Sequence, residues 1–176
     1  MKKNVIVLAS GMLCFLISCK GPESNSELDT IKKNLEINEK AMKAIETGNA
    51  TTIDSLISND IVDHMGPHGK EMKGGDKLKP MLIDMHNHWK NLKFDIITSS
   101  ANADYVFTLS KTTGTAIDTT MGMTAGTKMD ENMVDIIKIK DGKIVEHWGY
   151  VDPNAMMKKM HEMHAMERKI ETMPKK

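Results

Sequence analysis

The sequence predicts an α+β domain, because helical apolar spacing fills its first half and alternating apolar spacing fills its second half. In residues 28–45, 53–57 and 78–89, apolar residues recur every three or four positions, as on one face of a helix. After Trp89 the period changes to two, which is the spacing of a half-buried strand, and Asp141-Gly142 indicates a tight hairpin turn. Helices followed by a run of antiparallel strands are typical of an α+β fold.

Two helices are expected at the start of the folded part. The sequence of residues 26–29, Ser-Glu-Leu-Asp, resembles a helix-opening cap. Polar Asn38 lies in the apolar row of the first helix, which should end near Gly48; the row consists of Leu28, Ile31, Leu35, Met42 and Ile45. A second, shorter helix should carry the apolar residues Ile53, Leu56 and Ile57.

A brief strand and a third helix come next. Residues 60–64 indicate the strand, and residues 65–75 indicate a glycine-containing loop. Asp76 can cap the third helix, with Pro80 in the first turn, where a missing N–H costs little. One face of this helix should carry the apolar residues Leu78, Leu82, Met85 and Trp89.

Two long hairpins are expected after Trp89. The first covers residues 92–116 and turns near residues 101–103; the second covers residues 129–152 and turns at residues 141–142. A two-residue turn pairs Lys140 with Lys143 and places His147 opposite Ile136. Alternation then predicts an outer face of Asp135, Glu146, Trp148 and Tyr150, and an inner face of Val134, Ile136, Val145, His147, Gly149 and Val151. A bulge would shift this register and reverse the assignment.

The first 18 residues are typical of a lipoprotein signal peptide. Lys2 and Lys3 precede an apolar stretch, residues 5–17, that is too short for a comfortable membrane span. The stretch ends in Leu-Ile-Ser-Cys, which resembles a bacterial lipobox with Cys19 as the lipidated residue. Residues 19–26 then suit a flexible tether. We expect a protein attached by lipid to the bacterial cell envelope, facing the periplasm or the outside.

Charge and cysteine content exclude several classes of function. The 24 Lys and Arg residues lose Lys2 and Lys3 with the signal peptide, whereas the 24 Asp and Glu residues stay, so the mature net charge is close to −2. That balance argues against a nucleic-acid partner. Cys14 leaves with the signal peptide and Cys19 is committed to lipid, so no thiol remains for a disulfide or a nucleophile. No cofactor is expected.

The segment DIIKIKDGKIVEHWGYVD at residues 135–152 resembles the SnoaL-like polyketide-cyclase family of the nuclear-transport-factor-2-like superfamily, as do KTTGT at 111–115 and DIVDHMGPHG at 60–69. The similarity runs roughly from Lys33 to Met160. It implies a cone-shaped domain over residues 27–153, in which a strongly curved antiparallel sheet wraps around N-terminal helices and leaves a cavity at its open end. The family includes enzymes and non-enzymes, and its members often form homodimers through the sheet.

His147 is the central candidate residue of the cavity. An imidazole among valines and isoleucines is expected to be neutral near neutral pH, which suits general acid–base work. The alternative is a core histidine bonded to a backbone carbonyl. Asp63 and His64 match a pair that the family often has near the cavity mouth, and either could assist His147. The positions expected to contact a ligand are Asn38, Trp89, Ile136, Val145 and Gly149.

The resemblance also predicts that one catalytic group is missing. In characterised cyclases of the family, the acid–base carboxylate lies two residues after this histidine, at the position of Gly149. A polyketide cyclisation is therefore not expected. Asp152 is a poor replacement, because Asp152-Pro153 is typical of a helix start, with the aspartate as N-cap and the proline as the first helical residue.

Two further groups of polar residues are interpreted as structural. The series Thr108, Ser110 and Thr112 is expected to be ordinary strand surface, in preference to the alternative of a hydrogen-bonding wall. His86 and His88 project from different sides of the third helix, and no third ligand follows at a matching spacing, so they are weak evidence for a metal site.

Residues 154–176 predict a C-terminal helix rich in methionine and histidine. Met157 and His161 stand four apart, as do Met160 and His164, and each such pair could offer a soft ligand set for copper. The alternative, which we favour, is an apolar stripe that docks on the domain or on a partner, formed by Met156, Met160, Met163, Ile170 and Met173.

Three functions are consistent with these patterns. The first is binding of a small, largely apolar molecule in the cavity without catalysis. The second is proton-transfer chemistry, as in an isomerase, dehydratase or hydrolase, with His147 as acid–base and His64 or Asp63 assisting. The third is copper or other metal handling in the periplasm through the C-terminal helix. The missing carboxylate at Gly149 places binding ahead of catalysis.

Overall fold

The computed structural model describes residues 23–66, 70–120, 123–154, 157 and 161. The signal peptide, Cys19 and nearly all of the methionine-rich segment therefore lie outside the described residues. Helix α1 spans Glu23–Thr47, so it already includes the last four residues of the segment assigned to the tether. Of the described residues, none belongs to a helix that is both long and apolar enough to cross a membrane.

The first two helices are present as predicted, but the expected cap at Ser26 is wrong, because this residue lies inside α1. Gly48 lies in the left-handed region, with φ of 62°, and ends α1. Asn49 caps the next helix, α2 (Ala50–Leu56), by accepting a hydrogen bond of 3.0 Å from the N–H of Thr52. Ile57, which was expected on this helix, instead begins strand β1.

Helix α3 spans Gly75–His88 and begins slightly earlier than predicted. Its N-cap is Gly74, with φ of 98°, and no side chain caps the first turn, so the expected cap at Asp76 is wrong. Asp76 lies inside the first turn, where a carboxylate interacts favourably with the helix dipole. Pro80 consequently lies two residues further into the helix than expected.

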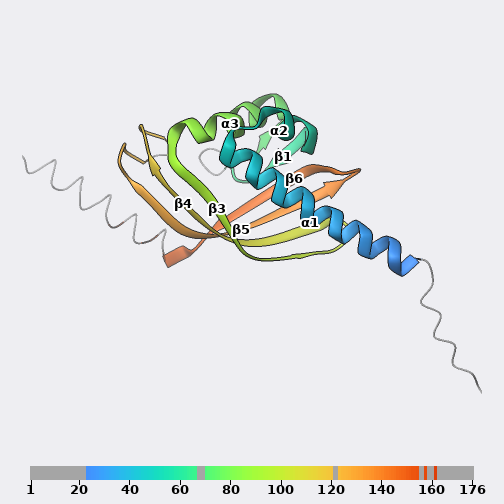
Figure 1. Ribbon diagram of the computed structural model, residues 1–176. Coiled ribbons are helices and arrows are strands. Elements are labelled where there is room, and N and C mark those ends of the chain that lie inside the picture. Colours follow the sequence, from blue (N-terminus) through green and yellow to red (C-terminus); the bar gives the residue numbers. More distant parts are fainter. Residues whose placement is uncertain (1–22, 67–69, 121–122, 155–156, 158–160, 162–176) are drawn as a thin grey trace, which may run out of the picture.

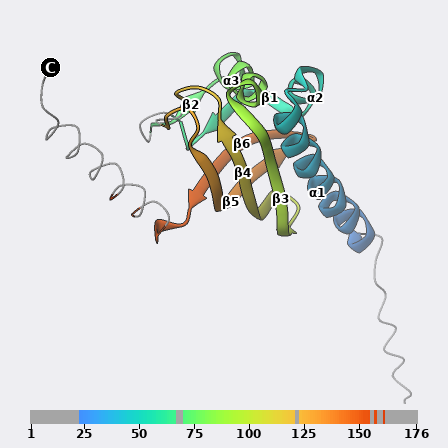
Figure 2. The ribbon, with the colours of Figure 1, turned by 60° about the vertical axis from the view of Figure 1, so that its left-hand side comes forward.

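Six strands form one curved, open sheet on which the three helices pack (Figures 1 and 2). Its order is β2-β1-β6-β5-β4-β3, and every pairing is antiparallel except that of β1 with β6. The α+β prediction is thus confirmed, although the sheet is mixed. The strands are β1 (Ile57–Asp63), β2 (Met72–Lys73), β3 (Trp89–Ala101), β4 (Tyr105–Ala116), β5 (Lys128–Lys140) and β6 (Lys143–Val151).

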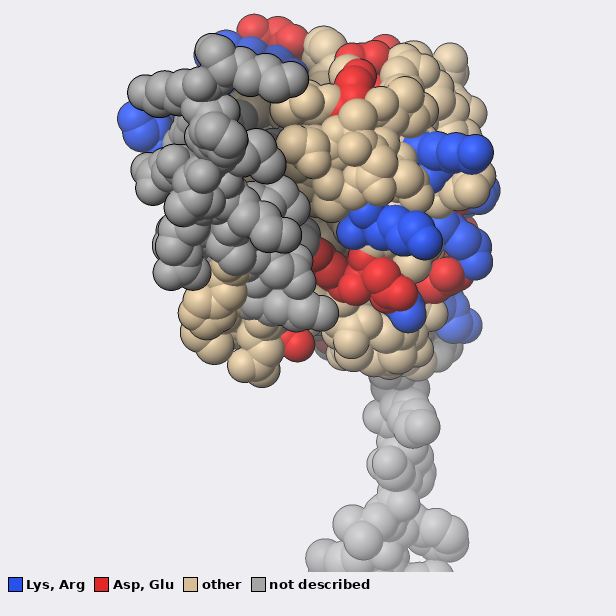
Figure 3. All heavy atoms as spheres, turned by 90° about the vertical axis from the view of Figure 1, so that its left-hand side faces the viewer, with Lys and Arg blue, Asp and Glu red and all other residues tan. Residues whose placement is uncertain are grey.

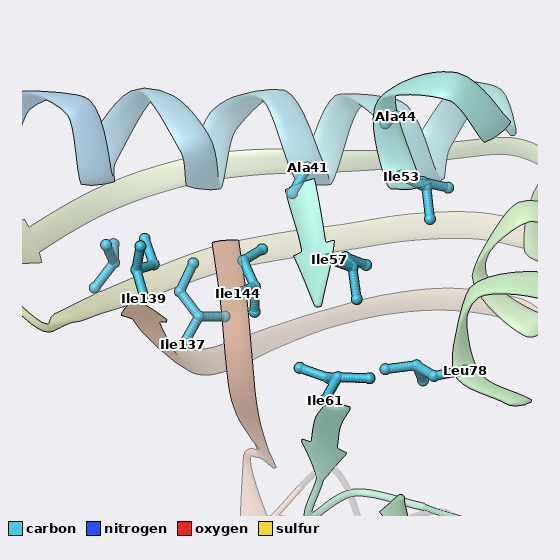
Figure 4. Packing of buried hydrophobic residues seen from close by; sticks show 10 residues of the cluster. Ala41, Ala44, Ile53, Ile57, Ile61, Leu78, Ile137, Ile139 and Ile144 are labelled. Carbon is cyan, nitrogen blue, oxygen red and sulfur yellow. The ribbon is translucent and has the colours of Figure 1, made fainter. Parts of the chain in front are cut away.

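The hydrophobic core lies between the helices and the inner face of the sheet. Figure 4 shows side chains from helices and strands meeting in this layer. Small residues on α1 let the helix approach the strands closely, whereas the sheet contributes mainly isoleucine. The buried cluster comprises Ala41, Ala44, Ile53, Ile57, Ile61, Leu78, Val106, Ile137, Ile139 and Ile144.

A bulge near the β5–β6 turn changes the predicted register. Lys140 pairs with Lys143, as the two-residue turn requires. One step later the register shifts between Ile139 and Lys138, so His147 lies opposite Ile137 rather than Ile136. The extra residue on β6 is Val145, which leaves the alternation at that point.

The bulge reverses the faces of β5 while His147 keeps its inward orientation. Ile137 and Ile139 are buried, whereas Val134, expected inside, is 37% exposed. Asp135 has the same parity as the two buried isoleucines and therefore belongs to the inner face. The prediction that Asp135 lies on the outer face is wrong.

The outer surface carries charges of both signs. On the face drawn in Figure 3, basic and acidic side chains lie next to one another instead of forming a patch of one sign. Two ion pairs of this kind are Lys93 with Asp95 on β3, and Lys111 with Asp130 at 2.9 Å between β4 and β5. Exposed pairs of this kind contribute little to stability.

Candidate functional site

A cavity of about 210 Å³ lies between α1, α3 and the inner face of the sheet. Its lining is mainly apolar and includes six methionines: Met42, Met65, Met81, Met85, Met129 and Met133. Asn38 and Trp89 line it, as predicted. Ile136 and Val145 are absent from the lining described by the structure, because the bulge moves β5 by one residue and displaces Val145.

One wall of the cavity carries a cluster of Asp63, His147 and Asp135. The Nδ1 atom of His147 lies 3.0 Å from Oδ1 of Asp63, and its Nε2 atom lies 3.3 Å from Oδ1 of Asp135. Asp63 ends β1 and pairs in register with His147 on β6, while Asp135 lies on β5, the other neighbour of β6. Three neighbouring strands, β1, β6 and β5, therefore each contribute one side chain to the cluster.

The two carboxylates determine the charge of His147. Burial lowers the pKa of the imidazole, but hydrogen bonds with Asp135 and Asp63 outweigh burial and raise the pKa from 6.5 to about 9. Burial opposes ionisation of Asp63 too, yet its bonds with His147 and with the N–H of Met65 lower its pKa overall. The expectation of a neutral imidazole is wrong, because the sequence patterns placed only apolar residues around it.

Asp135 is the functional residue that sequence reasoning missed. The predicted register assigned it to the outer face with Glu146 and Trp148. Both parities of β5 contain isoleucine, Ile136 on one and Ile137 on the other, so apolar alternation alone did not distinguish them. Only the bulge beside the Asp-Gly turn decides which parity faces the cavity.

Gly149 lies directly opposite Asp135 in the β5–β6 register. It does not line the cavity among the described residues, and a Cβ atom at this position would collide with Sδ of Met65. Met65 therefore covers the place where the resemblance predicted a carboxylate. Asp135 brings a carboxylate to the inner face from the adjacent strand instead.

His64 lies outside the cavity, contrary to expectation. Its ring stacks on Trp148, with centroids 4.5 Å apart and planes 7° from parallel. Its Nδ1 atom is 3.0 Å from Glu71, and its Nε2 atom is 3.4 Å from Glu146. Strand alternation places these contacts on the opposite side of the sheet from His147, so His64 cannot assist that residue.

The polar series on β4 is buried, so its interpretation as ordinary strand surface is wrong. Thr108, Ser110 and Thr112 are exposed by 2% or less. Thr108 Oγ1 accepts a hydrogen bond of 2.9 Å from Asn38 and lies 3.1 Å from Ser99 Oγ. Ser110 Oγ has no hydrogen-bond partner among the described residues.

The remaining candidates do not join the cavity site. His88 bridges Asp118 and Asp84, and Nδ1 of His86 lies 2.8 Å from the Ile83 carbonyl. Within the described ranges, no cluster of three or more His, Cys, Asp or Glu side chains is arranged to hold a metal ion.

At the end of the sheet, Asp152 accepts a hydrogen bond of 2.8 Å from the N–H of Asn154, which confirms its role as an N-cap. Met157 and His161 are both helical and exposed. The second pair proposed for copper, Met160 and His164, lies outside the described residues.

Comparisons with known proteins give a consistent family and fold. The model of the SnoaL-like polyketide cyclase family matches residues 36–160. Among curated proteins, none matches the chain. An LEH-like epoxide hydrolase from M. tuberculosis superimposes with a TM-score of 0.60 at 16% identity, covering 73% of this chain and 89% of the hydrolase.

Two Streptomyces structures are similar to the same extent. IdmH from Streptomyces antibioticus, described as a putative polyketide cyclase, gives a TM-score of 0.59 at 20% identity, covering 73% of this chain and 98% of IdmH. AclR from Streptomyces galilaeus, described as a putative hydroxylase, also gives 0.59 at 20% identity, covering 75% of this chain and 98% of AclR. At these identities the similarity establishes the fold only.

Proposed function

Since the chain belongs to the SnoaL-like polyketide cyclase family, we propose that its cavity binds a small, largely apolar molecule. One observation carries this proposal: an apolar cavity of about 210 Å³ adjoins a polar cluster that can orient a ligand. For scale, an engineered apolar cavity of about 150 Å³ is large enough to bind benzene. The six methionines of the wall are flexible and can adapt to the shape of a ligand.

Filling the cavity tests this proposal. Met85→Trp adds volume inside the lining, whereas Met157→Trp adds the same volume at a position that is 53% exposed and outside it. Toluene binding to the full-length chain, followed by chemical-shift changes of methionine methyl groups, should be lost in the first variant and retained in the second. Equal binding in both variants would refute cavity binding.

A second candidate is acid–base catalysis on the bound molecule. The observation that favours it is the carboxylate of Asp135 on the cavity wall, which restores the group missing at Gly149. Both nitrogens of His147 contact carboxylates, so His147 positions Asp135 and offsets its charge, while Asp63 holds the other side of the ring. Asp135 is then the group that takes a proton from the substrate and returns it.

Deuterium exchange tests this second candidate without knowledge of the natural substrate. Proton abstraction next to a carbonyl is a step shared by isomerisation and dehydration, and phenylacetone is a small apolar ketone for which it can be followed by NMR. The wild-type chain should accelerate exchange, Asp135→Asn should remove the acceleration, and Asp130→Asn on the outer surface should retain it. Exchange no faster than in buffer would argue against the acid–base role.

Attachment to the membrane through Cys19 is a further proposal, supported by the sequence of residues 1–19. Metabolic labelling with an alkyne-bearing fatty acid should label the wild-type chain in bacterial cells. Cys19→Ser should abolish labelling and release the protein from the membrane fraction. Labelling that persists in this variant would refute the assignment.

A homodimer through the outer face of the sheet is supported by exposed apolar side chains. Phe107, Val134 and Tyr150 are 43%, 37% and 55% exposed on β4, β5 and β6. Analytical ultracentrifugation should show a dimer for the wild-type chain and a monomer for Phe107→Glu. A monomeric wild-type chain at high concentration would contradict this proposal.

A further inference from the structure

The polar groups that the cavity offers to a ligand are mainly hydrogen-bond acceptors, and the wall carries a negative charge. We propose that the cavity selects neutral or cationic molecules bearing a hydroxyl or amine donor and rejects anions such as carboxylates. This inference rests on the proposed binding function and adds the chemical class of the ligand. It is carried by Asp135, His147, Asp63 and Asn38.

The charge of the cluster follows from its contacts. A neutral imidazole has only one N–H, yet each nitrogen of His147 faces a carboxylate oxygen, at 3.0 and 3.3 Å. One extra proton must therefore lie in the cluster. With that proton on His147, the imidazolium and the two carboxylates together carry a charge of −1.

No basic side chain offsets this charge within the part of the lining that the structure describes. The charged or titratable residues of the lining are Asp63, Asp135 and His147. The only other polar side-chain groups in the described lining are those of Asn38 and Thr112 and the indole N–H of Trp89. Electrostatic interactions are stronger in such surroundings than in water. A ligand carboxylate would lose its hydration and meet a charge of the same sign, whereas an ammonium group would meet an attractive one.

Apart from the indole N–H of Trp89, the side-chain donors described on the wall are already in use. Nδ2 of Asn38 donates to Thr108 Oγ1 at 2.9 Å and to Met42 Sδ at 3.7 Å, which leaves the amide oxygen as its open group. Thr112 donates to Met133 Sδ at 3.4 Å. Both N–H groups of His147 face aspartates.

Among the described residues, Asp135 has no side-chain partner besides His147, so its second carboxylate oxygen is open as well. Besides the indole N–H of Trp89, the side-chain groups left for a ligand are thus the oxygens of Asp135, Asn38 and Thr112, which accept hydrogen bonds. A ligand must supply the donors.

Four benzyl compounds of similar size separate charge from hydrogen bonding. Benzylamine is a cation at pH 7, benzyl alcohol is a neutral donor, toluene lacks a polar group and benzoate is an anion. Dissociation constants for the full-length chain, measured by NMR titration, should rank benzylamine and benzyl alcohol tighter than toluene, and benzoate weakest. We expect at least a tenfold ratio between benzylamine and benzoate.

A matched pair of variants then tests whether the carboxylate of Asp135 causes the preference for benzylamine over benzoate. Asp135→Asn removes the negative charge of the cluster and one acceptor, so the benzylamine-to-benzoate ratio should fall about tenfold. Asp130→Asn removes an exposed carboxylate outside the cavity and should leave the ratio unchanged. If Asp135→Asn does not fold, the order in which the wild-type chain binds the four benzyl compounds still tests whether the cavity rejects anions.

The outcomes distinguish this inference from the proposed function. Toluene binding with no discrimination among the other three compounds would overturn the inference and leave cavity binding standing. Benzoate binding as tightly as benzylamine would overturn it too. If none of the four compounds binds, the proposed function fails and the ligand class fails with it.

Discussion

Oδ1 of Asp135 lies 3.3 Å from Nε2 of His147 on the inner face of the sheet. The two residues belong to adjacent strands, and the bulge at Val145 brings them to the same side. Asp63 occupies the other ring nitrogen at 3.0 Å. The site is consequently a charged, hydrogen-bonded cluster on the wall of an apolar cavity, and its behaviour with pH follows from that arrangement.

Stability should decrease as pH rises through the alkaline range. The pKa of His147 is raised from 6.5 to about 9, so between these values the folded chain holds a proton that the unfolded chain has released. The stabilisation is fully present below pH 6.5 and is lost by about pH 9. Its size is on the order of 2 to 3 kcal/mol. Urea unfolding of the wild-type chain at several pH values measures it.

The control for this prediction is His147→Gln, which cannot take up the proton. The difference in unfolding free energy between the two proteins should shrink from pH 6 to pH 10. Asp63 acts in the opposite direction: its pKa is lowered, so its contribution is present above about pH 4 and is lost on further acidification. A constant difference across the alkaline range would contradict the cluster.

Removing the Asp135 carboxylate should lower the pKa of His147. Asp135→Asn deletes a hydrogen-bond acceptor and a negative charge next to Nε2, so the pKa should fall by about one unit or more. NMR titration of the imidazole Cε1–H signal measures the change. Asp130→Asn, whose carboxylate pairs with Lys111, should leave the titration unchanged. The same pKa in both variants would show that the carboxylate of Asp135 does not act on the ring.

The hydroxyl groups of β4 should respond oppositely to deletion. Ser110 Oγ is buried without a partner among the described residues, so Ser110→Ala should leave the free energy of unfolding unchanged or raise it by up to about 1 kcal/mol. Thr108→Val removes the acceptor used by Asn38 and should lower it by about 1 to 3 kcal/mol. Equal effects of the two substitutions would contradict the hydrogen-bond assignment.

A side chain at position 149 should compete with the side chain of Met65 for the same space. A Cβ at this position would collide with Sδ of Met65, but that side chain is flexible and 37% exposed and can move aside, so Gly149→Ala should destabilise the protein by at most about 1 kcal/mol. Met65→Ala in the same chain should relieve most of that loss. A double-mutant cycle of unfolding free energies measures the coupling, and additive effects would show that the two residues do not compete.

Local signals in the sequence predicted much of the fold. The Asp141-Gly142 turn, the end of α1 at Gly48 and the N-cap at Asp152 depend on a few neighbouring residues, and the structure confirms all three. The cap of α3 was misassigned because Gly74, with a positive φ, lets the helix begin before Asp76. Glycine and aspartate differ as N-caps by only roughly a few tenths of a kcal/mol, so residue type alone did not decide between Gly74 and Asp76.

The candidate site was predictable only in part. His147 and Asn38 face the cavity as predicted, whereas Asp135 and His64 lie on the faces opposite to those expected. One bulged residue reverses a whole strand, because side chains alternate with a period of two. Thr108, Ser110 and Thr112 were misassigned because alternating hydroxyl residues occur both on exposed strands and on buried strands whose hydroxyl groups have polar partners. The sequence pattern is the same in the two cases.

The sequence by itself determined the α+β architecture, the order of its helices and hairpins, and the inward orientation of His147. Short-range periodicity, turns and caps are enough for these. Only the tertiary structure decided the charge of that imidazole and the polarity of the cavity. Asp63, Asp135 and His147 are far apart in the chain, and their meeting depends on a parallel β1–β6 pairing and on the register beyond the bulge. Neither of these leaves a local pattern in the sequence.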